Sequence, residues 1–219
     1  MEVDLELEKF KKSFDKKLEQ FFINLIECQN DPCLINYLHE VKEYVLNGGK
    51  RLRPYILWKM ISEQCQNVSA YDNVLIAFEL LHNSTLIEDD IIDKHTVRRN
   101  RKTLPVVFNK NSINGEHLSL LVANLLKDKA LTLILEAKIS SQKRKDCLVA
   151  FNNISMSVNE GQVQDLAFRK NLSVNEKKLK SQVKLVSACF IGEMFKLGAM
   201  KNREIWFEVG VRLGVIFQM

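Results

Sequence analysis

Residues 79–93 read Glu-Leu-Leu-His-Asn-Ser-Thr-Leu-Ile-Glu-Asp-Asp-Ile-Ile-Asp, and this segment says most about the architecture of the chain. With the apolar run before it, Val74 to Phe78, the segment is apolar nearly all round at helical spacing, which predicts a helix at the centre of a helical protein. Asp89 and Asp93 are four residues apart and therefore share a helix face. Two carboxylates aimed at one place repel each other unless a cation lies between them, so the segment suggests a site for a Mg²⁺-bound diphosphate.

A line of polar side chains runs along this otherwise apolar helix. Glu79, His82, Asp89 and Asp93 fall on it, with Leu86 in the gap. A solvated face is the ordinary interpretation of such a line. It is disfavoured here because a buried carboxylate without a partner costs several kcal/mol, by order of magnitude. His82 alone would be read as a core histidine, but its place on the line makes it a candidate ligand contact.

Composition narrows the class of protein. The chain has 219 residues, is 46% hydrophobic, and holds 8 Gly and 3 Pro. So few helix breakers predict a mostly helical protein with a core of its own. The net charge of +5 suits an anionic small substrate without requiring one. Nucleic acid is disfavoured as a partner, because no long basic face interleaved with aromatic residues is present.

Targeting and redox signals point to the cytoplasm. Residues 1–20 alternate acidic and basic groups without the apolar core of a signal peptide, and no apolar run reaches the roughly 18 residues of a membrane span. We therefore expect no transmembrane segment, a cytoplasmic location and reduced thiols. The cysteines are scattered and match no metal motif: Cys28, Cys33, Cys65, Cys147 and Cys189.

Periodicity and capping residues predict eight or so antiparallel helices in one bundle, forming a single domain over residues 1–219. Residues 94–113, which are polar and contain Pro105, are expected to be a loop. The expected helices are 3–25; one from Asp31-Pro32 to Asn47-Gly48-Gly49; one opened by Pro54; one capped by Ser69 and running into the aspartates; one from Ser112 or Asn114 to about Ala137; about Lys143 to Phe168; one from the capping box Ser173–Glu176 to about Met200; and one from Asn202 to Met219.

Three further motifs are weaker by themselves. In residues 48–54, Gly-Gly-Lys-Arg-Leu-Arg-Pro, cations at a helix start suit an anion, although an ordinary basic turn explains them as well. The run of Arg98, Arg99, Arg101 and Lys102 is either solvated or neutralises a diphosphate. Residues 160–165, Glu-Gly-Gln-Val-Gln-Asp, place Gln162 and Asp165 on one helix face.

Together these blocks resemble the trans-isoprenyl diphosphate synthase family, the all-α head-to-tail prenyltransferases, and in particular the N-terminal portion of a geranylgeranyl diphosphate synthase-like enzyme. The resemblance implies an all-α antiparallel bundle of the isoprenoid synthase type, incomplete at the C-terminus. Four blocks carry it in order along nearly the whole chain: residues 48–54; residues 79–93 with Arg98-Arg99; residues 161–165; and Gly210 with residues 214–218.

The resemblance implies an Mg²⁺-dependent condensation of isopentenyl diphosphate with an allylic diphosphate. Asp89 and Asp93 would bind Mg²⁺ with Asp90 supporting them. Arg98 would contact the allylic diphosphate and Arg99 the isopentenyl diphosphate. The remaining implied contacts are Lys50, Arg53 and His82 for isopentenyl diphosphate, and Gln162, Asp165, Lys184 and Gln218 around the allylic diphosphate and the cation.

The chain departs from the family pattern at several positions. Glu88 stands where His or Leu is common, Asn100 where Gly is usual, and Leu185 where Thr usually follows the catalytic lysine. The largest departure is the second aspartate-rich motif, which would follow Gln218 and which this chain lacks. The sequence therefore predicts a split enzyme: a second, short polypeptide supplies that motif, and the resulting protomers pair as in the homodimers of the family.

Two other interpretations remain open. The chain could be a non-catalytic regulatory subunit of a prenyl diphosphate synthase heteromer, although the intact aspartates and arginines argue against that role. It could also be a truncated piece of a complete enzyme.

Product length has a local signal on the helix that bears the aspartates. In the family, bulky residues four and five positions before the first aspartate close the product cavity. Here those positions hold the small residues Thr85 and Ser84, so the floor is expected deeper, at Leu81 or Phe78, with a product of C20 or longer.

Overall fold

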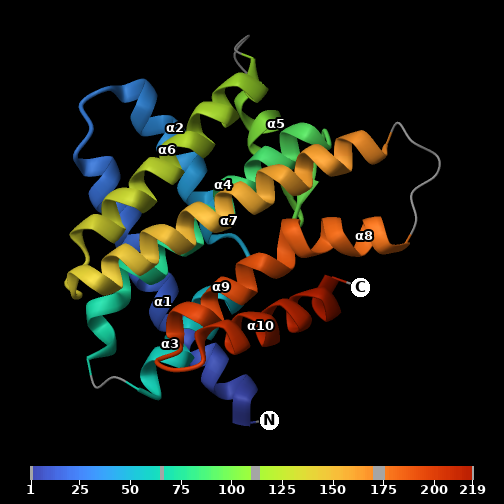
Figure 1. The fold of residues 1–219 in the computed structure, drawn as a ribbon. Coiled ribbons are helices and arrows are strands. Elements are labelled where there is room, and N and C mark those ends of the chain that lie inside the picture. The colour runs from blue at the N-terminus through green and yellow to red at the C-terminus, as the bar shows by residue number, and fades with distance from the viewer. Residues whose placement is uncertain (1, 65–66, 110–113, 170–175, 219) are drawn as a thin grey trace. The chain divides into compact units, whose positions relative to one another are not determined.

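The computed structural model of the protein describes residues 2–64, 67–109, 114–169 and 176–218, and the all-α class expected from the sequence is confirmed (Figure 1). The chain divides into two compact units: residues 1–51 with 76–133, and residues 52–75 with 134–219. Ser112, Ser173 and Met219, which were expected at helix boundaries, and Cys65 lie outside the described residues.

The first unit begins with two helices that pack against each other, α1 (Glu2–Glu27) and α2 (Pro32–Leu46). Apolar side chains on one face of α1 are buried, including Phe14 and Leu18. The cap predicted for α2 is confirmed, because Oδ1 of Asp31 accepts hydrogen bonds from the backbone nitrogens of Cys33 at 2.7 Å and Leu34 at 3.2 Å. A side chain that acts locally thus determines where α2 begins.

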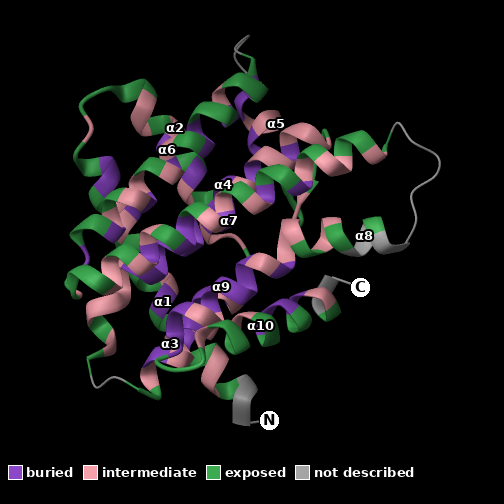
Figure 2. Cartoon of the chain, viewed as in Figure 1, coloured by how far each residue is buried: buried purple, intermediate pink, exposed green. Residues whose placement is uncertain are grey.

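Helix α4 (Asp72–Ile92) carries the apolar segment and the aspartates at its C-terminal end. Every residue from 74 to 81 is buried, as expected for a helix that is apolar nearly all round (Figure 2). Its predicted start was wrong in one respect. Ser69 lies inside a 3-10 turn, η1 (Val68–Tyr71), and its hydroxyl donates to Oδ1 of Asn67 at 2.8 Å instead of capping α4.

The segment expected to be a loop between residues 94 and 113 contains regular structure. Strands β1 (Val97–Arg98) and β2 (Arg101–Lys102) form an antiparallel hairpin, and α5 (Leu104–Phe108) follows with Pro105 in its first turn. The two residues between the strands, Arg99 and Asn100, have φ of 50° and 61°. Positive φ at both central residues is the requirement of a type I′ hairpin turn, and Asn is the residue after Gly that best tolerates it.

Helix α6 (Gly115–Glu136) follows, and all of it up to Leu133 belongs to the first unit. Asn114 is its cap: Oδ1 accepts from the nitrogens of Glu116 at 3.0 Å and His117 at 3.2 Å. Glu88, one of the departures from the family pattern, faces α6 and pairs with Nζ of Lys127 at 2.5 Å. The unusual glutamate therefore has a matching cation within its own unit.

The second unit contains α3 (Leu52–Ser62), α7 (Ser141–Phe168), α8 (Glu176–Val183), a π-helical turn (Lys184–Ala188), α9 (Cys189–Gly198) and α10 (Arg203–Gln218). Helix α9 packs against α3, α7 and α10 (Figure 1). Helix α10 also approaches the π-helical turn closely: a Cβ on Gly214 would lie 2.6 Å from Cα of Ala188, so only glycine fits there. Helix α3 begins two residues before Pro54, which was expected to open it.

Apolar side chains remain exposed on two helices of the second unit (Figure 2). On α7, Val149, Met156 and Val163 are 51%, 53% and 68% exposed and recur every seven residues. On α10, Ile205 and Ile216 are 64% and 71% exposed. Within the described parts of the chain, no helix is long and apolar enough to cross a membrane.

Candidate functional site

Three donor groups converge at the C-terminal end of α4. One ligand atom each from Asp89, Asp93 and His95 lies within 4.8 Å of the other two. The structure thus places the two carboxylates predicted from helical spacing next to each other, and adds an imidazole that was not predicted from the sequence.

His95 reaches this group because α4 ends in a chain reversal. Lys94 has a left-handed φ of 53°. The nitrogen of Lys94 donates to the carbonyl of Ile91 at 3.3 Å, and the nitrogen of His95 donates to that of Asp90 at 3.0 Å. These two bonds form a Schellman cap. Glycine is the usual residue at its left-handed position, and because lysine occupies that position here, the reversal was not predicted.

The side chain of Asp90 contacts Arg98 and Tyr44. Its side chain is fully buried, with Oδ1 accepting from Nε of Arg98 at 2.7 Å and Oδ2 accepting from the hydroxyl of Tyr44 at 2.8 Å. Nη2 of Arg98 also lies 2.9 Å from Oδ2 of Asp89. Asp90 was predicted to support the metal ligands, and the contribution seen here is to hold Arg98 against Asp89.

Electrostatics agree with that arrangement. Burial opposes the charged form of Arg98, but Asp90 and Asp89 outweigh it, so the pKa of Arg98 is raised. Burial and the charge of Asp90 raise the pKa of Tyr44, which keeps its hydroxyl a hydrogen-bond donor at any ordinary pH. Arg98 therefore stays positively charged, and Tyr44 stays neutral, throughout the neutral pH range.

The basic block at residues 48–54 is divided by the structure. Lys50 is exposed, whereas the side chain of Arg51 is completely buried. Arg51 donates through Nε to Asp15 at 2.7 Å and through Nη1 to Glu79 at 2.5 Å. Glu79 was predicted to lie on the ion-binding line, and Arg51 to be one of the cations that suit an anion, but these two side chains form an internal ion pair.

Arg99 lies at the hairpin turn and is joined to the end of α2. Its Nη1 donates to the carbonyl of Asn47 at 3.1 Å, and Nδ2 of Asn47 donates to the carbonyl of Arg99 at 3.3 Å. Burial lowers the pKa of Arg99, and the nearby cations Arg51 and Arg98 lower it further. An anion bound nearby would favour the charged form of this guanidinium.

Apart from His82, which is half-buried on α4 in the first unit, the other predicted diphosphate contacts belong to the second unit. Arg53 lies with its guanidinium carbon 5.1 Å from the ring centre of Phe190, and Lys184 is exposed at the start of the π turn. Gly161 of α7 faces that turn, where a Cβ would lie 2.5 Å from Cγ2 of Val186, so the glycine permits the close approach. Gln162 is half-buried, and the side chain of Gln218 lies outside the described residues.

Asp165 has a partner that was not predicted from the sequence. Its Oδ2 accepts from Nε of Arg169 at 2.8 Å and from Nη2 at 2.5 Å. Both side chains are partly exposed, at 31% and 46%, so this pair is of the kind that contributes little to stability and can exchange partners.

The residues predicted to set product length lie in the middle of α4. Phe78, Leu81 and Ser84 are completely buried, while Thr85 is half-buried. Both hydroxyls turn back onto their own helix: Ser84 donates to the carbonyl of Leu81 at 2.7 Å and Thr85 to that of His82 at 2.8 Å. Neither hydroxyl therefore adds an unpaired polar group to this region.

The donor set at the end of α4 fits a hard divalent cation in part. Two carboxylates from adjacent helical turns are typical ligands of Mg²⁺, which keeps several waters and takes few protein ligands. The imidazole of His95 is more typical of transition metals. Asp89 and Asp93 are therefore the residues that fit Mg²⁺, with His95 beside them.

Comparison with known proteins identifies the family of the chain. Residues 35–219 match the family model described as polyprenyl synthetase. The chain is 30% identical over 183 residues to a short chain isoprenyl diphosphate synthase of Methanocaldococcus jannaschii, covering 81% of this chain and 54% of that protein. It is 27% identical over 189 residues to a geranylgeranyl diphosphate synthase of Methanosarcina mazei, covering 83% and 56%. The chain thus spans about half the length of these curated relatives.

Solved structures share the fold. The geranylgeranyl pyrophosphate synthetase of Pyrococcus horikoshii superposes with a TM-score of 0.86 at 23% identity, covering 100% of this chain and 65% of that one. A geranylgeranyl pyrophosphate synthase of Corynebacterium glutamicum, solved with isoprenyl diphosphate and magnesium, gives 0.82 at 23% identity, covering 97% and 66%.

Proposed function

The chain belongs to the polyprenyl synthetase family, and from this we propose that it is the larger part of a prenyltransferase that joins isopentenyl diphosphate to an allylic diphosphate. The product we propose is geranylgeranyl diphosphate (C20) or a longer prenyl diphosphate. The observation that carries the proposal is the grouping of Asp89, Asp93 and His95 beside Arg98. It places two carboxylates and a guanidinium together, which is the chemistry that holds a metal-bound diphosphate.

In this reaction the allylic carbon–oxygen bond breaks and diphosphate leaves with the bonding electrons. A carbon–carbon bond then forms to the isopentenyl double bond, and a proton is lost. Mg²⁺, when bound, would neutralise the leaving diphosphate. Arg98, held by Asp90, would stabilise the same developing charge, and its fixed position means that little reorganisation is needed when the charge appears.

The other predicted roles are part of the proposal. Arg99 would contact the isopentenyl diphosphate with Lys50, Arg53 and His82. Support comes from the lowered pKa of Arg99, which indicates a cation in surroundings that an anion would improve. Around the allylic diphosphate and the cation we propose Gln162, Asp165, Lys184 and Gln218.

Metal binding is testable on the chain by itself. Titration with Mn²⁺, followed by electron paramagnetic resonance, should show one site weakened by about tenfold or more in Asp89→Asn and in Asp93→Asn, since each removes a charged ligand. Glu88→Gln is the matched control, because that carboxylate is adjacent in sequence but pairs with Lys127. Equal affinities in all three variants would refute the metal site.

We further propose that a second, short polypeptide completes the enzyme. The observation that supports this is the exposed apolar surface of α10, where Ile205 and Ile216 face solvent. The partner would cover α10 and bring a second group of carboxylates. Isopentenyl transfer should appear when the chain is mixed with a polypeptide carrying a second aspartate-rich helix. Turnover by residues 1–219 alone at the rate of the mixture would contradict the split arrangement.

A non-catalytic subunit is the competing function, and one experiment separates the two. In the active mixture, Asp93→Asn should abolish transfer if this chain carries the reaction. If the partner carries it, the variant should change product length or nothing, while binding between the chains persists in both cases.

Pairing of protomers is the last element of the proposal. Val149, Met156 and Val163 form an exposed apolar line on α7 at seven-residue spacing, which suits helix packing between two copies. Light scattering should give a dimer that Met156→Glu dissociates.

We place the protein in the cytoplasm, where the cysteines seen as free, Cys28, Cys33, Cys147 and Cys189, would stay reduced.

A further inference from the structure

His95 is the donor at the end of α4 that lies outside the aspartate-rich motif, which it follows by two positions. A ring nitrogen of His95 nevertheless lies within 4.8 Å of a carboxylate oxygen of Asp89 and of one of Asp93. Two ligands of one metal ion, each at about 2.1 Å, are at most about 4.2 Å apart. The three donors therefore need to approach one another by about 0.6 Å at most to share an ion.

The backbone of His95 is held on both sides. Its nitrogen donates to the carbonyl of Asp90 at 3.0 Å, and its carbonyl accepts from the hydroxyl of Thr103 at 2.6 Å. Thr103 is completely buried, and its own nitrogen donates to the carbonyl of Thr96 at 3.1 Å. Because the segment is already tied to α4 and to the start of α5, placing the imidazole beside the aspartates requires little further ordering when an ion binds.

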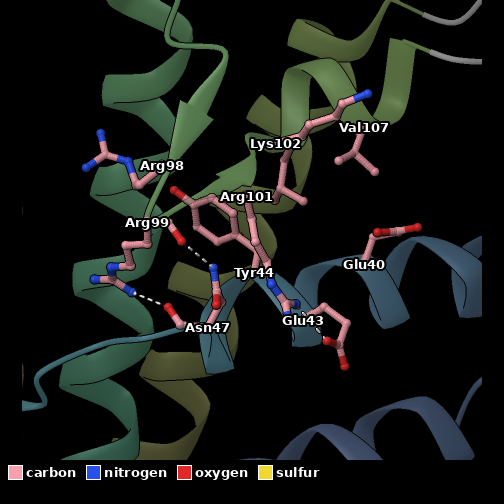
Figure 3. Close-up of a pocket in the computed structure, with 10 residues that line it drawn as sticks. Glu40, Glu43, Tyr44, Asn47, Arg98, Arg99, Arg101, Lys102 and Val107 are labelled. Carbon is pink, nitrogen blue, oxygen red and sulfur yellow. Dashed lines mark hydrogen bonds and ion pairs between the residues drawn. The ribbon is translucent and has the colours of Figure 1, made fainter.

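A buried carboxylate lies next to the imidazole. Nδ1 of His95 is 3.5 Å from Oδ1 of Asp90. Asp90 is held in turn by Arg98 and Tyr44, and Figure 3 shows Tyr44 pointing from α2 toward the strand that carries Arg98. A metal-bound histidine usually has a carboxylate or a carbonyl at its other ring nitrogen, which fixes the orientation of the ring and makes it a better donor. Asp90 occupies that place here.

The imidazole is also accessible to an ion from solvent, since the side chain of His95 is 48% exposed. Its chemistry differs from that of the two carboxylates. Oxygen ligands suit Mg²⁺, which keeps several waters, whereas imidazole suits first-row transition metal ions such as Ni²⁺ and Zn²⁺. A nitrogen ligand at this position would therefore strengthen the binding of those ions much more than the binding of Mg²⁺.

We propose that His95 is a third metal ligand of this site, and that it raises the affinity for first-row transition metal ions such as Ni²⁺ relative to Mg²⁺. The inference rests on the metal site of the proposed function and deepens it, because it names a further ligand and the class of ion that this ligand selects. Mg²⁺ would still bind through Asp89 and Asp93.

The direct test is pulsed electron paramagnetic resonance of the full chain loaded with stoichiometric Mn²⁺. A bound imidazole should give a ¹⁴N coupling, which should disappear in His95→Asn while Mn²⁺ remains bound. His117→Asn is the matched control, because it removes an exposed histidine of α6 and should leave the coupling unchanged. Bound Mn²⁺ without a nitrogen coupling in the unaltered chain would overturn the proposal and leave the two carboxylate ligands in place.

The preference between ions is measured by displacement of that Mn²⁺ with Ni²⁺ or with Mg²⁺. Displacement reports this site alone, even if Ni²⁺ also binds exposed histidines elsewhere. In His95→Asn the affinity for Ni²⁺ should fall by about tenfold or more, and that for Mg²⁺ by less than about threefold. Equal losses for the two ions would show that His95 only supports the local structure, which is the opposite of what we propose.

His95→Gln is a second variant that keeps the measurement independent of one substitution. Because the side chain is half-exposed, circular dichroism of both variants should match that of the unaltered chain. Prenyl transfer is not needed for either readout. A nitrogen coupling in a chain that never supports transfer would sustain this inference while the proposed function failed. Mn²⁺ binding that is absent, or that is the same in Asp93→Asn, would remove the metal site and this inference with it.

Discussion

The hydroxyl of Tyr44 lies 2.8 Å from Oδ2 of Asp90, joining α2 to the end of α4 across 46 positions of sequence. Asp90 is completely buried, and its other oxygen is occupied by Arg98. Tyr44 therefore determines which way the carboxylate faces, and through it where the guanidinium of Arg98 lies.

Removing the hydroxyl of Tyr44 should lower the stability of the folded protein. In Tyr44→Phe, one oxygen of a buried carboxylate loses its donor, so the free energy of unfolding should fall by about 1–3 kcal/mol. Urea denaturation followed by circular dichroism measures the loss. Tyr37→Phe is the control on the same helix, since its ring still packs edge-on against Phe108 at 5.3 Å. Equal losses in the two variants would show that the bond to Asp90 contributes nothing particular.

The ion pair of Arg51 should be among the most sensitive contacts of the first unit. Arg51→Met leaves Glu79, whose side chain is 3% exposed, as a buried charge without its cation. Breaking such a pair costs about 3–5 kcal/mol. Arg101→Met removes an exposed pair instead and should cost about 1 kcal/mol or less. Chemical denaturation compares them, and a smaller loss for Arg51→Met than for Arg101→Met would contradict the structure.

Product length should respond to Thr85 more cleanly than to Ser84. A phenylalanine at the fully buried Ser84 would overpack the helix and cost about 1–3 kcal/mol. Thr85 is only half-buried, so Thr85→Phe keeps the fold and should shorten the product of the reconstituted enzyme below C20. Thr85→Ser, which retains the hydroxyl, should leave the product unchanged. Chromatography of the dephosphorylated products gives the answer, and identical chain lengths in both variants would exclude this face as the floor.

Glu193 makes stability depend on pH. It is 4% exposed, and burial raises its pKa above the usual 4.5 despite a hydrogen bond from Asn153 at 3.0 Å. The folded state thus binds this proton more tightly than the unfolded state, and stability from this group falls as pH rises from 4.5 through the folded pKa. Glu193→Gln should therefore raise the melting temperature at pH 7 and have little effect near pH 4.5.

The matched control for that titration is Glu204→Gln. Glu204 pairs with Lys196 at 2.7 Å but is 78% exposed, so its substitution should change the melting temperature little at either pH. A stabilising effect of Glu193→Gln that was the same in acid as at neutral pH would assign it to packing instead of charge.

The sequence was sufficient wherever the cause of a feature is local. Asp31 and Asn114 cap their helices through bonds to residues two and three positions ahead, and both were predicted. The nearness of Asp89 and Asp93 follows from helical periodicity alone. The burial of α4 was likewise predictable, because a helix that is apolar nearly all round has no face to give to water.

What the sequence did not show depends on contacts between distant segments or on unusual backbone. The bond from Tyr44 to Asp90 and the burial of Arg51 between Asp15 and Glu79 arise when separate helices pack. The hairpin was missed because its left-handed turn residues are Arg99 and Asn100, without the glycine that usually marks such a turn. Local propensity describes neither situation.

The chain reversal at Lys94 bears on how the protein folds. Asp89, Asp93 and His95 come from a single short segment, and the hairpin that returns Arg98 follows within a few residues. Such short-range closures form within about microseconds, well before contacts between distant helices. We therefore expect the repulsion among the aspartates to be relieved early in folding, because the same short segment that brings them together also brings the guanidinium of Arg98.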